Sequence, residues 1–137
     1  MSQLVIKKFA QPDERRLFVA HGHVDLIRLK GGSIGMGVFE PGWRWSTDVQ
    51  PIAGTKSCQV AHTFYIVSGS MEIVMDDGSR GMLSAGDVAY IPPGHDAWVV
   101  GGEACLMVDF EGMSDYARRG ESLAQQAEAQ QSTPAMQ

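Results

Sequence analysis

Hydrophobic and polar residues alternate in short runs through the middle of the chain, which is the pattern of β-strands with one face in a core. The runs predict strands at Val24–Leu29, Ser33–Phe39, Cys58–Val67, Ser70–Met75, Val88–Ile91, Ala97–Val100 and Ala104–Phe110. Turn residues separate them. Asp76-Asp77-Gly78 is a hairpin signal, because Asp and Gly tolerate the positive φ of tight turns. No run between residues 24 and 110 has a helical period, so an all-β sandwich or barrel is predicted.

The two ends of the chain follow a different pattern. Residues 1–20 are predicted to form an N-terminal arm, in which the polar stretch Pro12–Arg16 serves as a linker. Ser114 can cap a helix, which we expect over residues 113–130. The polar residues 131–137 are predicted to be a disordered tail. The compact β domain is therefore expected at residues 21–112.

Composition and charge narrow the class of protein. The 137 residues suit one domain, and 44% hydrophobic with 20% charged residues is typical of a globular protein. A net charge of −5 disfavours nucleic acid, and no apolar run approaches the length of a membrane span. The N-terminus does not resemble a signal peptide, and two cysteines are too few for a disulfide scaffold. We therefore expect a cytoplasmic protein with reduced thiols.

His62 is the candidate catalytic residue. Period-2 alternation places it on one strand face together with Cys58, Val60, Phe64 and Ile66, so its side chain is predicted to point inward. Two interpretations stay open for His62, a functional group facing a cavity or a hydrogen-bonded core histidine. Cys58 is likewise either a thiolate ligand or a buried thiol.

Two segments resemble the two motifs of the cupin superfamily. The first, Cys58–Gly69, resembles a motif of H-x-H, three or four residues, E, and an aromatic–aliphatic strand ending in Gly. The second, Gly86–Trp98, resembles G-D-x-x-x-x-P-x-G-x-x-H. The segment Pro41–Trp45 is also similar to one in small bacterial cupins of unassigned function. The resemblance implies an antiparallel β-barrel of the jelly-roll type and a homodimer.

The metal ligands that the resemblance implies match only in part. His62 falls where the family has Glu, while Lys56 and Cys58 fall at the two His positions of the first motif. Ala97 falls at the last His, but His95 is two residues earlier and would share its face in a regular strand. The candidate metal ligands are thus Cys58, His62 and His95. Sulfur and imidazole favour zinc, iron or copper over magnesium.

Further residues are candidates for ligand binding: Trp43, Trp45, Tyr65, His95 and Trp98. Trp43 and Trp45 share a face if extended, and would form either a cavity wall or core or dimer contacts. Asp96 is expected to make a side-chain bond to the backbone. His21-Gly22-His23 imitates H-x-H, but we predict a surface turn there because Ile27 stands at the Glu position.

Two functions remain from these residues. Lys56 and Ala97 stand at two positions where the family has metal-binding histidines. They favour a small-molecule-binding cupin whose degenerate metal site is centred on His62, with no assigned activity. Cys58, His62 and His95 favour the alternative, a metal-dependent cupin enzyme, oxygenase- or isomerase-like, acting on a small organic substrate. Either protein would take a small-molecule ligand and form a homodimer, without nucleic acid or membrane as partner.

Overall fold

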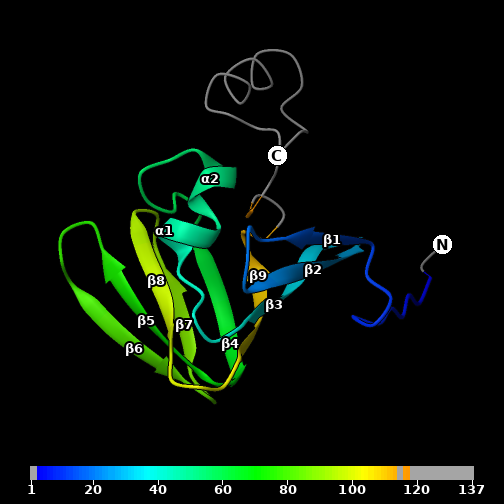
Figure 1. Ribbon diagram of the computed structural model, residues 1–137. Coiled ribbons are helices and arrows are strands. Elements are labelled where there is room, and N and C mark those ends of the chain that lie inside the picture. The colour runs from blue at the N-terminus through cyan, green and yellow to red at the C-terminus, as the bar shows by residue number, and fades with distance from the viewer. Residues whose placement is uncertain (1–2, 114–115, 118–137) are drawn as a thin grey trace, which may run out of the picture.

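The computed structural model describes residues 3–113 and 116–117, and they form a mainly antiparallel β fold (Figure 1). The strands make two sheets, one in the order β1-β2-β3-β9-β4-β7 and one in the order β6-β5-β8. The elements are β1 Glu14–Leu17, β2 Gly22–Leu29, β3 Gly32–Phe39, α1 Trp45–Asp48, α2 Gln50–Ala53, β4 His62–Ser68, β5 Ser70–Met75, β6 Arg80–Ser84, β7 Val88–Ile91, β8 His95–Val100 and β9 Cys105–Glu111. The antiparallel all-β prediction is confirmed, while no ladder of the described residues joins the two sheets into a closed barrel.

The predicted strands are all present, with shifted ends. β5 and β7 have the predicted bounds, but β4 begins at His62 instead of Cys58. The turn signals also lie where expected: Gly78, in the turn between β5 and β6, has a φ of 91°. Gly69, between β4 and β5, has a φ of 78°, and a Cβ there would lie 2.3 Å from the carbonyl oxygen of Ala104. Glycine is required at that position by conformation and by space.

Four elements contradict the sequence prediction. β1 lies where Pro12–Arg16 was expected to be a linker, because its charged side chains pair with neighbours: Arg15 Nε lies 2.7 Å from Asp25 Oδ1. β6 was missed, since its residues are mostly exposed and show little alternation. The four-residue helices α1 and α2 lie in a region where none was expected. Elements of one turn are too short for a helical period to appear.

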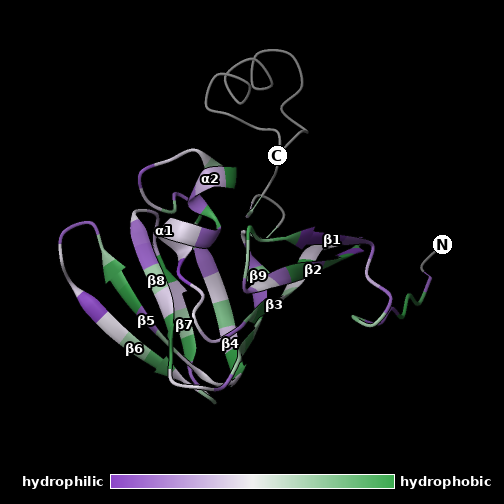
Figure 2. Cartoon of the chain, viewed as in Figure 1, coloured by the Kyte–Doolittle hydropathy of each residue, from purple (hydrophilic) through white to green (hydrophobic). Residues whose placement is uncertain are grey.

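The core lies between the two sheets and is built from every second residue of the strands, the ones that point inward. β4 illustrates the pattern, with His62, Phe64 and Ile66 buried and Tyr65 and Val67 exposed. Figure 2 shows the corresponding bands of hydrophobic and hydrophilic residues along the strands. No helix of the described residues is long and apolar enough to cross a membrane. Apart from Met113, Tyr116 and Ala117, the predicted helix at 113–130 lies outside the described residues, as does the tail.

Candidate metal centre

β4 directs His62 into the space between the sheets, where the residue is 4% exposed. Its Nδ1 lies 2.6 Å from Oδ2 of Asp109, a residue of β9 that is fully buried. A carboxylate accepts hydrogen bonds, so this contact assigns a proton to Nδ1 and leaves a lone pair on Nε2. The imidazole is thus held with its metal-binding nitrogen facing away from Asp109.

His95 begins β8 and is buried on the same inward face as Ala97, as expected for two residues of a regular strand. Its Nδ1 lies 2.9 Å from the carbonyl oxygen of Pro92, which can only accept. Nδ1 therefore carries the proton, and Nε2 has a free lone pair. Burial lowers the pKa of His95 to about 4, so the ring is neutral at pH 7.

Cys58 reaches the same space from the loop before β4. Its backbone bridges to β8, with Cys58 N donating to His95 O at 2.8 Å and Gly94 N donating to Cys58 O at 2.7 Å. The Cys58 Sγ atom lies 3.8 Å from Nε2 of His62. Burial raises the pKa of Cys58 to about 12, so the side chain is a protonated thiol unless a cation binds it.

The three side chains bring their ligand atoms within 4.8 Å of one another, and all three residues are buried. In a tetrahedral zinc site, bond lengths of roughly 2.3 Å to sulfur and 2.0 Å to nitrogen separate the two ligand atoms by about 3.5 Å. The 3.8 Å between Cys58 Sγ and His62 Nε2 is close to that value. Both imidazoles also have the second-nitrogen hydrogen bond usual for metal-bound histidine. The donor set therefore fits a soft or borderline transition metal.

A small cavity adjoins two of these residues, His62 and His95. It is lined by Phe39, Trp43, Trp45, His62, Phe64, Met71, Ile73, Ile91, His95, Ala97, Met107, Met113 and Tyr116. Its volume of about 20 Å³ is enough for one water molecule. Trp43 and Trp45, for which a cavity wall was one of the alternatives, line the cavity. Their buried indole N–H groups have no hydrogen-bond partner among the described residues. A hydrogen-bond acceptor bound in the cavity would relieve the cost of leaving them unpaired.

The other two candidate ligand-binding residues lie outside this cavity. Tyr65 points to the opposite, outer face of its sheet and is 41% exposed. Trp98 faces outward from β8, with the Arg44 guanidinium 4.4 Å from its ring centroid. Asp96 Oδ1 accepts a hydrogen bond from Ser46 N at 3.1 Å, which ties β8 to α1. A ligand held in the cavity would therefore not contact Tyr65 or Trp98.

Two residues that border the site, Asp109 and Tyr116, are not among those predicted from the sequence. Asp109 was detectable, since it shares the inward parity of β9 with the buried residues Cys105 and Met107. The Tyr116 ring lies edge-on to His62, with centroids 5.1 Å apart, and burial raises its pKa well above the usual value. No signal marked Tyr116, because it lies in a segment expected to be a surface helix.

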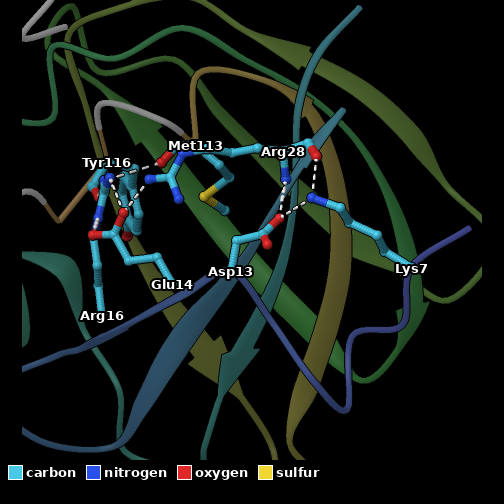
Figure 3. Close-up of polar contacts among 7 residues, drawn as sticks. All are labelled: Lys7, Asp13, Glu14, Arg16, Arg28, Met113 and Tyr116. Atoms are coloured by element: carbon cyan, nitrogen blue, oxygen red, sulfur yellow. Dashed lines mark hydrogen bonds and ion pairs between the residues drawn. The ribbon is translucent and has the colours of Figure 1, made fainter. Parts of the chain in front are cut away.

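Arg16 of β1 holds the segment that brings Tyr116 to the cavity. Figure 3 shows its guanidinium donating to two backbone carbonyls, 3.3 Å to Met113 and 2.9 Å to Tyr116. The carboxylate of Glu14 accepts from the same guanidinium at 2.7 Å. The strand that sequence analysis took for a linker therefore positions one wall of the site.

A model of the EutQ-like cupin domain matches residues 38–107, about half of the chain. The chain belongs to the EutQ-like cupin family. The matched region runs from β3 into β9 and includes Cys58, His62 and His95, while Asp109 and Tyr116 follow it. The superfamily resemblance of the two sequence motifs is thus confirmed.

Several solved structures share the fold of this cupin. A protein of unknown function from Rhizobium leguminosarum is 16% identical with a TM-score of 0.55, and the match covers 79% of this chain and 95% of that one. A protein of unknown function from Acinetobacter is 14% identical with a TM-score of 0.53, covering 72% and 90%. Oxalate decarboxylase from Lactobacillus farciminis, in a formate complex, is 19% identical with a TM-score of 0.50, covering 70% and 30%. No curated protein matches the chain.

Proposed function

We propose that this cupin binds a divalent transition metal through Cys58 Sγ, His62 Nε2 and His95 Nε2, and acts on a small molecule at that metal. The observation that carries the proposal is the convergence of three buried donor atoms within 4.8 Å. Three protein ligands leave a coordination position open, which distinguishes catalytic from structural zinc sites. Zinc, iron or copper suits the donors.

The hydrogen bonds behind the two histidines favour this function over a degenerate site. Each Nδ1 is engaged, by Asp109 and by the Pro92 carbonyl, so each Nε2 is the ring nitrogen left to bind a metal. His62 Nε2 lies 3.8 Å from the Cys58 thiol, the third ligand of the proposed site. Lys56 and Ala97 weakened the metal interpretation, but Cys58, His62 and His95 still supply three ligand atoms within 4.8 Å of one another.

The nature of the donors also indicates which metal to expect. One structural neighbour, oxalate decarboxylase from Bacillus subtilis, is described as having Mn(II) centres. That likeness, at 18% identity and a TM-score of 0.50, concerns the fold alone. A thiolate is a poor ligand for manganese compared with zinc, copper or iron. We therefore expect this chain to select a softer metal than that neighbour.

A bound metal would supply a Lewis acid able to polarise an oxygen ligand or lower the pKa of a water. The residues of the chain have separate tasks around it. Asp109 holds the His62 ring and raises the basicity of its Nε2, and the apolar wall keeps bulk water out. The indole N–H groups of Trp43 and Trp45 are donors for an oxygen atom. A ligand larger than one water requires the wall to move, since the cavity holds about 20 Å³.

Metal analysis of the purified protein tests this function directly. We expect one zinc, iron or copper per chain after purification without metal affinity resin, and a thiolate-to-metal charge-transfer band after exchange for Co²⁺. Cys58→Ser should lose the band and most of the metal. Cys105→Ser is the matched control, because Cys105 is the other buried cysteine and lies outside the cluster.

Two outcomes would decide against the proposal. A wild-type protein that takes up none of these metals would support the alternative, a metal-free cupin that binds a small molecule. A Co²⁺ spectrum unchanged in Cys58→Ser would show that the metal binds elsewhere on the chain.

A further inference from the structure

A second cavity lies on the side of the core where the two sheets are not joined. β6 and β7 are edge strands, one in each sheet, and no ladder of the described residues pairs them. Residues of β5, β6 and β7 border a space of about 250 Å³, compared with about 20 Å³ for the cavity beside His62 and His95. We call this space the side cleft. Its apolar lining is Ile73, Met75, Gly81, Leu83, Ala89 and Ile91.

The pairing register places this lining on the inward face of both sheets. Ile73 lies opposite Gly81 on β6, and Ile91 of β7 lies opposite the buried residue His62. Paired residues of an antiparallel ladder point to the same face, so a side chain at position 81 would point inward with Ile73. Three further lining residues pack against the core but are only partly buried: Met75, Leu83 and Ala89. The side cleft therefore has apolar surface that the fold leaves uncovered.

Two polar lining residues are engaged away from the side cleft. Arg80 Nε lies 3.1 Å from Glu72 Oε2, and its guanidinium carbon is 5.3 Å from the ring centroid of Trp98, which faces outward. The hydroxyl of Ser79 donates to Oδ1 of Asp77 at 2.7 Å. Burying an ionic or polar group without a partner is costly, so the side cleft suits the hydrocarbon part of a molecule.

Gly81 keeps the side cleft open. Its φ lies outside the left-handed region, and a Cβ added to it would meet nothing within 4 Å, so neither conformation nor crowding requires glycine there. Glycine weakens the interior of a strand, and it often marks a place where a ligand approaches closely. Any larger residue at this position would fill the space between Ile73 and β7.

Two isoleucines separate the side cleft from the candidate metal centre. Ile73 and Ile91 line both the side cleft and the cavity beside His62 and His95, and both are buried. A change of rotamer at either side chain would join the two spaces. The larger space is therefore continuous with the proposed site across a wall one side chain thick.

We infer that the side cleft binds the apolar tail of the substrate, whose oxygen-bearing head reaches the metal past Ile73 and Ile91. The inference rests on the proposed function and names its substrate class, a small molecule with an alkyl or aromatic tail and an oxygen acceptor at one end. The indole N–H groups of Trp43 and Trp45 are unpaired donors for that oxygen. At about 250 Å³ the side cleft lies near the lower end of small-molecule pockets, roughly 300–1,000 Å³, so the tail is short.

Unbranched carboxylates of increasing length test the inference on the full chain as purified, with methyl NMR as the readout. Acetate fits at the metal alone, whereas butanoate and hexanoate extend a tail into the side cleft. We expect the affinity to rise by up to about fourfold for each added methylene, and hexanoate to shift the methyl signals of Ile73 and Leu83. Gly81→Leu should abolish this dependence on length, because its side chain occupies the side cleft, and should leave the affinity for acetate unchanged.

The matched control is Gly102→Leu. Gly102 lies between β8 and β9, and a Cβ there would also meet nothing within 4 Å. This variant should keep the dependence on length, and thermal melting shows whether each variant is folded.

Three outcomes separate the side cleft from the metal. Equal affinities from acetate to hexanoate would overturn the inference and leave the metal function intact. A length dependence that persists in Gly81→Leu would also overturn it, since the tail would then bind elsewhere. Hexanoate binding that Gly81→Leu abolishes, in a protein that does not bind acetate, would support the side cleft and count against the metal function.

Discussion

The molecule contains two pairs of histidines that differ in sequence spacing, burial and surroundings. His21 and His23 have the H-x-H spacing expected of a cupin ligand pair, yet they lie at the start of β2, away from the cavity and partly exposed, and we call them the rim pair. His21 has a φ of 64° and its Nδ1 lies 3.0 Å from Asp48 Oδ2, while His23 Nε2 lies 3.5 Å from Asp25 Oδ2. His62 and His95 have no motif spacing, yet they are buried with their rings 5.6 Å apart.

The difference shows that ligand spacing along a chain is not sufficient for a metal site. His21 contacts Asp48 through Nδ1, as His62 contacts Asp109, but among the described residues neither His21 nor His23 belongs to a group of three metal-binding side chains, and His23 has its Nε2 toward Asp25. The buried pair has its carboxylate and carbonyl on the Nδ1 side only, and both Nε2 atoms remain available. Among the described residues, Cys58, His62 and His95 form the one group of three that could hold a metal.

Substituting one histidine of each pair should give the largest difference in metal binding. His62→Gln is expected to abolish metal binding, because it removes one of three ligands. His23→Gln should bind as the wild type does. Thermal melting with and without zinc, iron and copper checks this, since a metal that binds the native state raises its melting temperature. A metal-dependent shift that persists in His62→Gln would remove His62 from the site.

Within the buried pair, His95 should also limit stability in acid. The pKa of His95 is about 4 in the folded protein against an ordinary value of 6.5, so below pH 6.5 the unfolded chain binds the proton more readily. The free energy of unfolding should therefore fall as the pH drops from about 6.5 to about 4, by at most about 1.4 kcal/mol per pH unit.

Denaturation in chelator, to keep metal off the site, measures this acid dependence. His95→Gln should flatten the pH profile between those values, and His21→Gln should leave it as in the wild type. If the His95→Gln profile kept its full slope, another group would be responsible.

A smaller effect is expected at the residue behind His62. Asp109→Asn keeps the size of the side chain but removes the charge that orients the imidazole, and such outer partners contribute roughly 10- to 100-fold to metal affinity. Competition with a chromophoric chelator would measure the change. The comparable change at the rim, Asp48→Asn beside His21, should leave affinity unaltered. Equal affinities in the wild type and Asp109→Asn would assign Asp109 a purely structural role.

The smallest effect is expected from the rim itself. The side chain of His21 is 44% exposed, and partly exposed ion pairs contribute about 0–1 kcal/mol. His21→Gln should therefore shift the free energy of unfolding by less than about 1 kcal/mol, measured by urea denaturation at pH 7. A loss several times larger would mean that the His21–Asp48 contact organises the turn before β2.

Local sequence determined the strands and the direction of most side chains. Alternation alone placed His62 inward and gave the strands at Ser70–Met75 and Val88–Ile91, because pleating fixes which residues share a face. For His95 it gave only the face of Ala97 in a regular strand. The same rule would have found Asp109. Glycine and aspartate marked the turns for an equally local reason, their tolerance of positive φ. β1, α1 and α2 were not predicted. The two helices are single turns, too short to show a helical period, and β1 has four residues of which three are charged, so it shows no apolar alternation.

Only the tertiary structure decided that these residues form a site. The sequence placed Cys58 beside His62 by extending β4 to it, whereas Cys58 lies outside that strand and is held by a bridge to His95. Asp109 contacts His62 although the two residues are 47 positions apart in the sequence. Tyr116 reaches the cavity because Arg16, 100 positions away, donates a hydrogen bond to its carbonyl. A ligand set needs atoms within a few ångströms in three dimensions. Periodicity gives only the face on which each side chain lies, and the packing of β4, β8 and β9 supplies the distances between them.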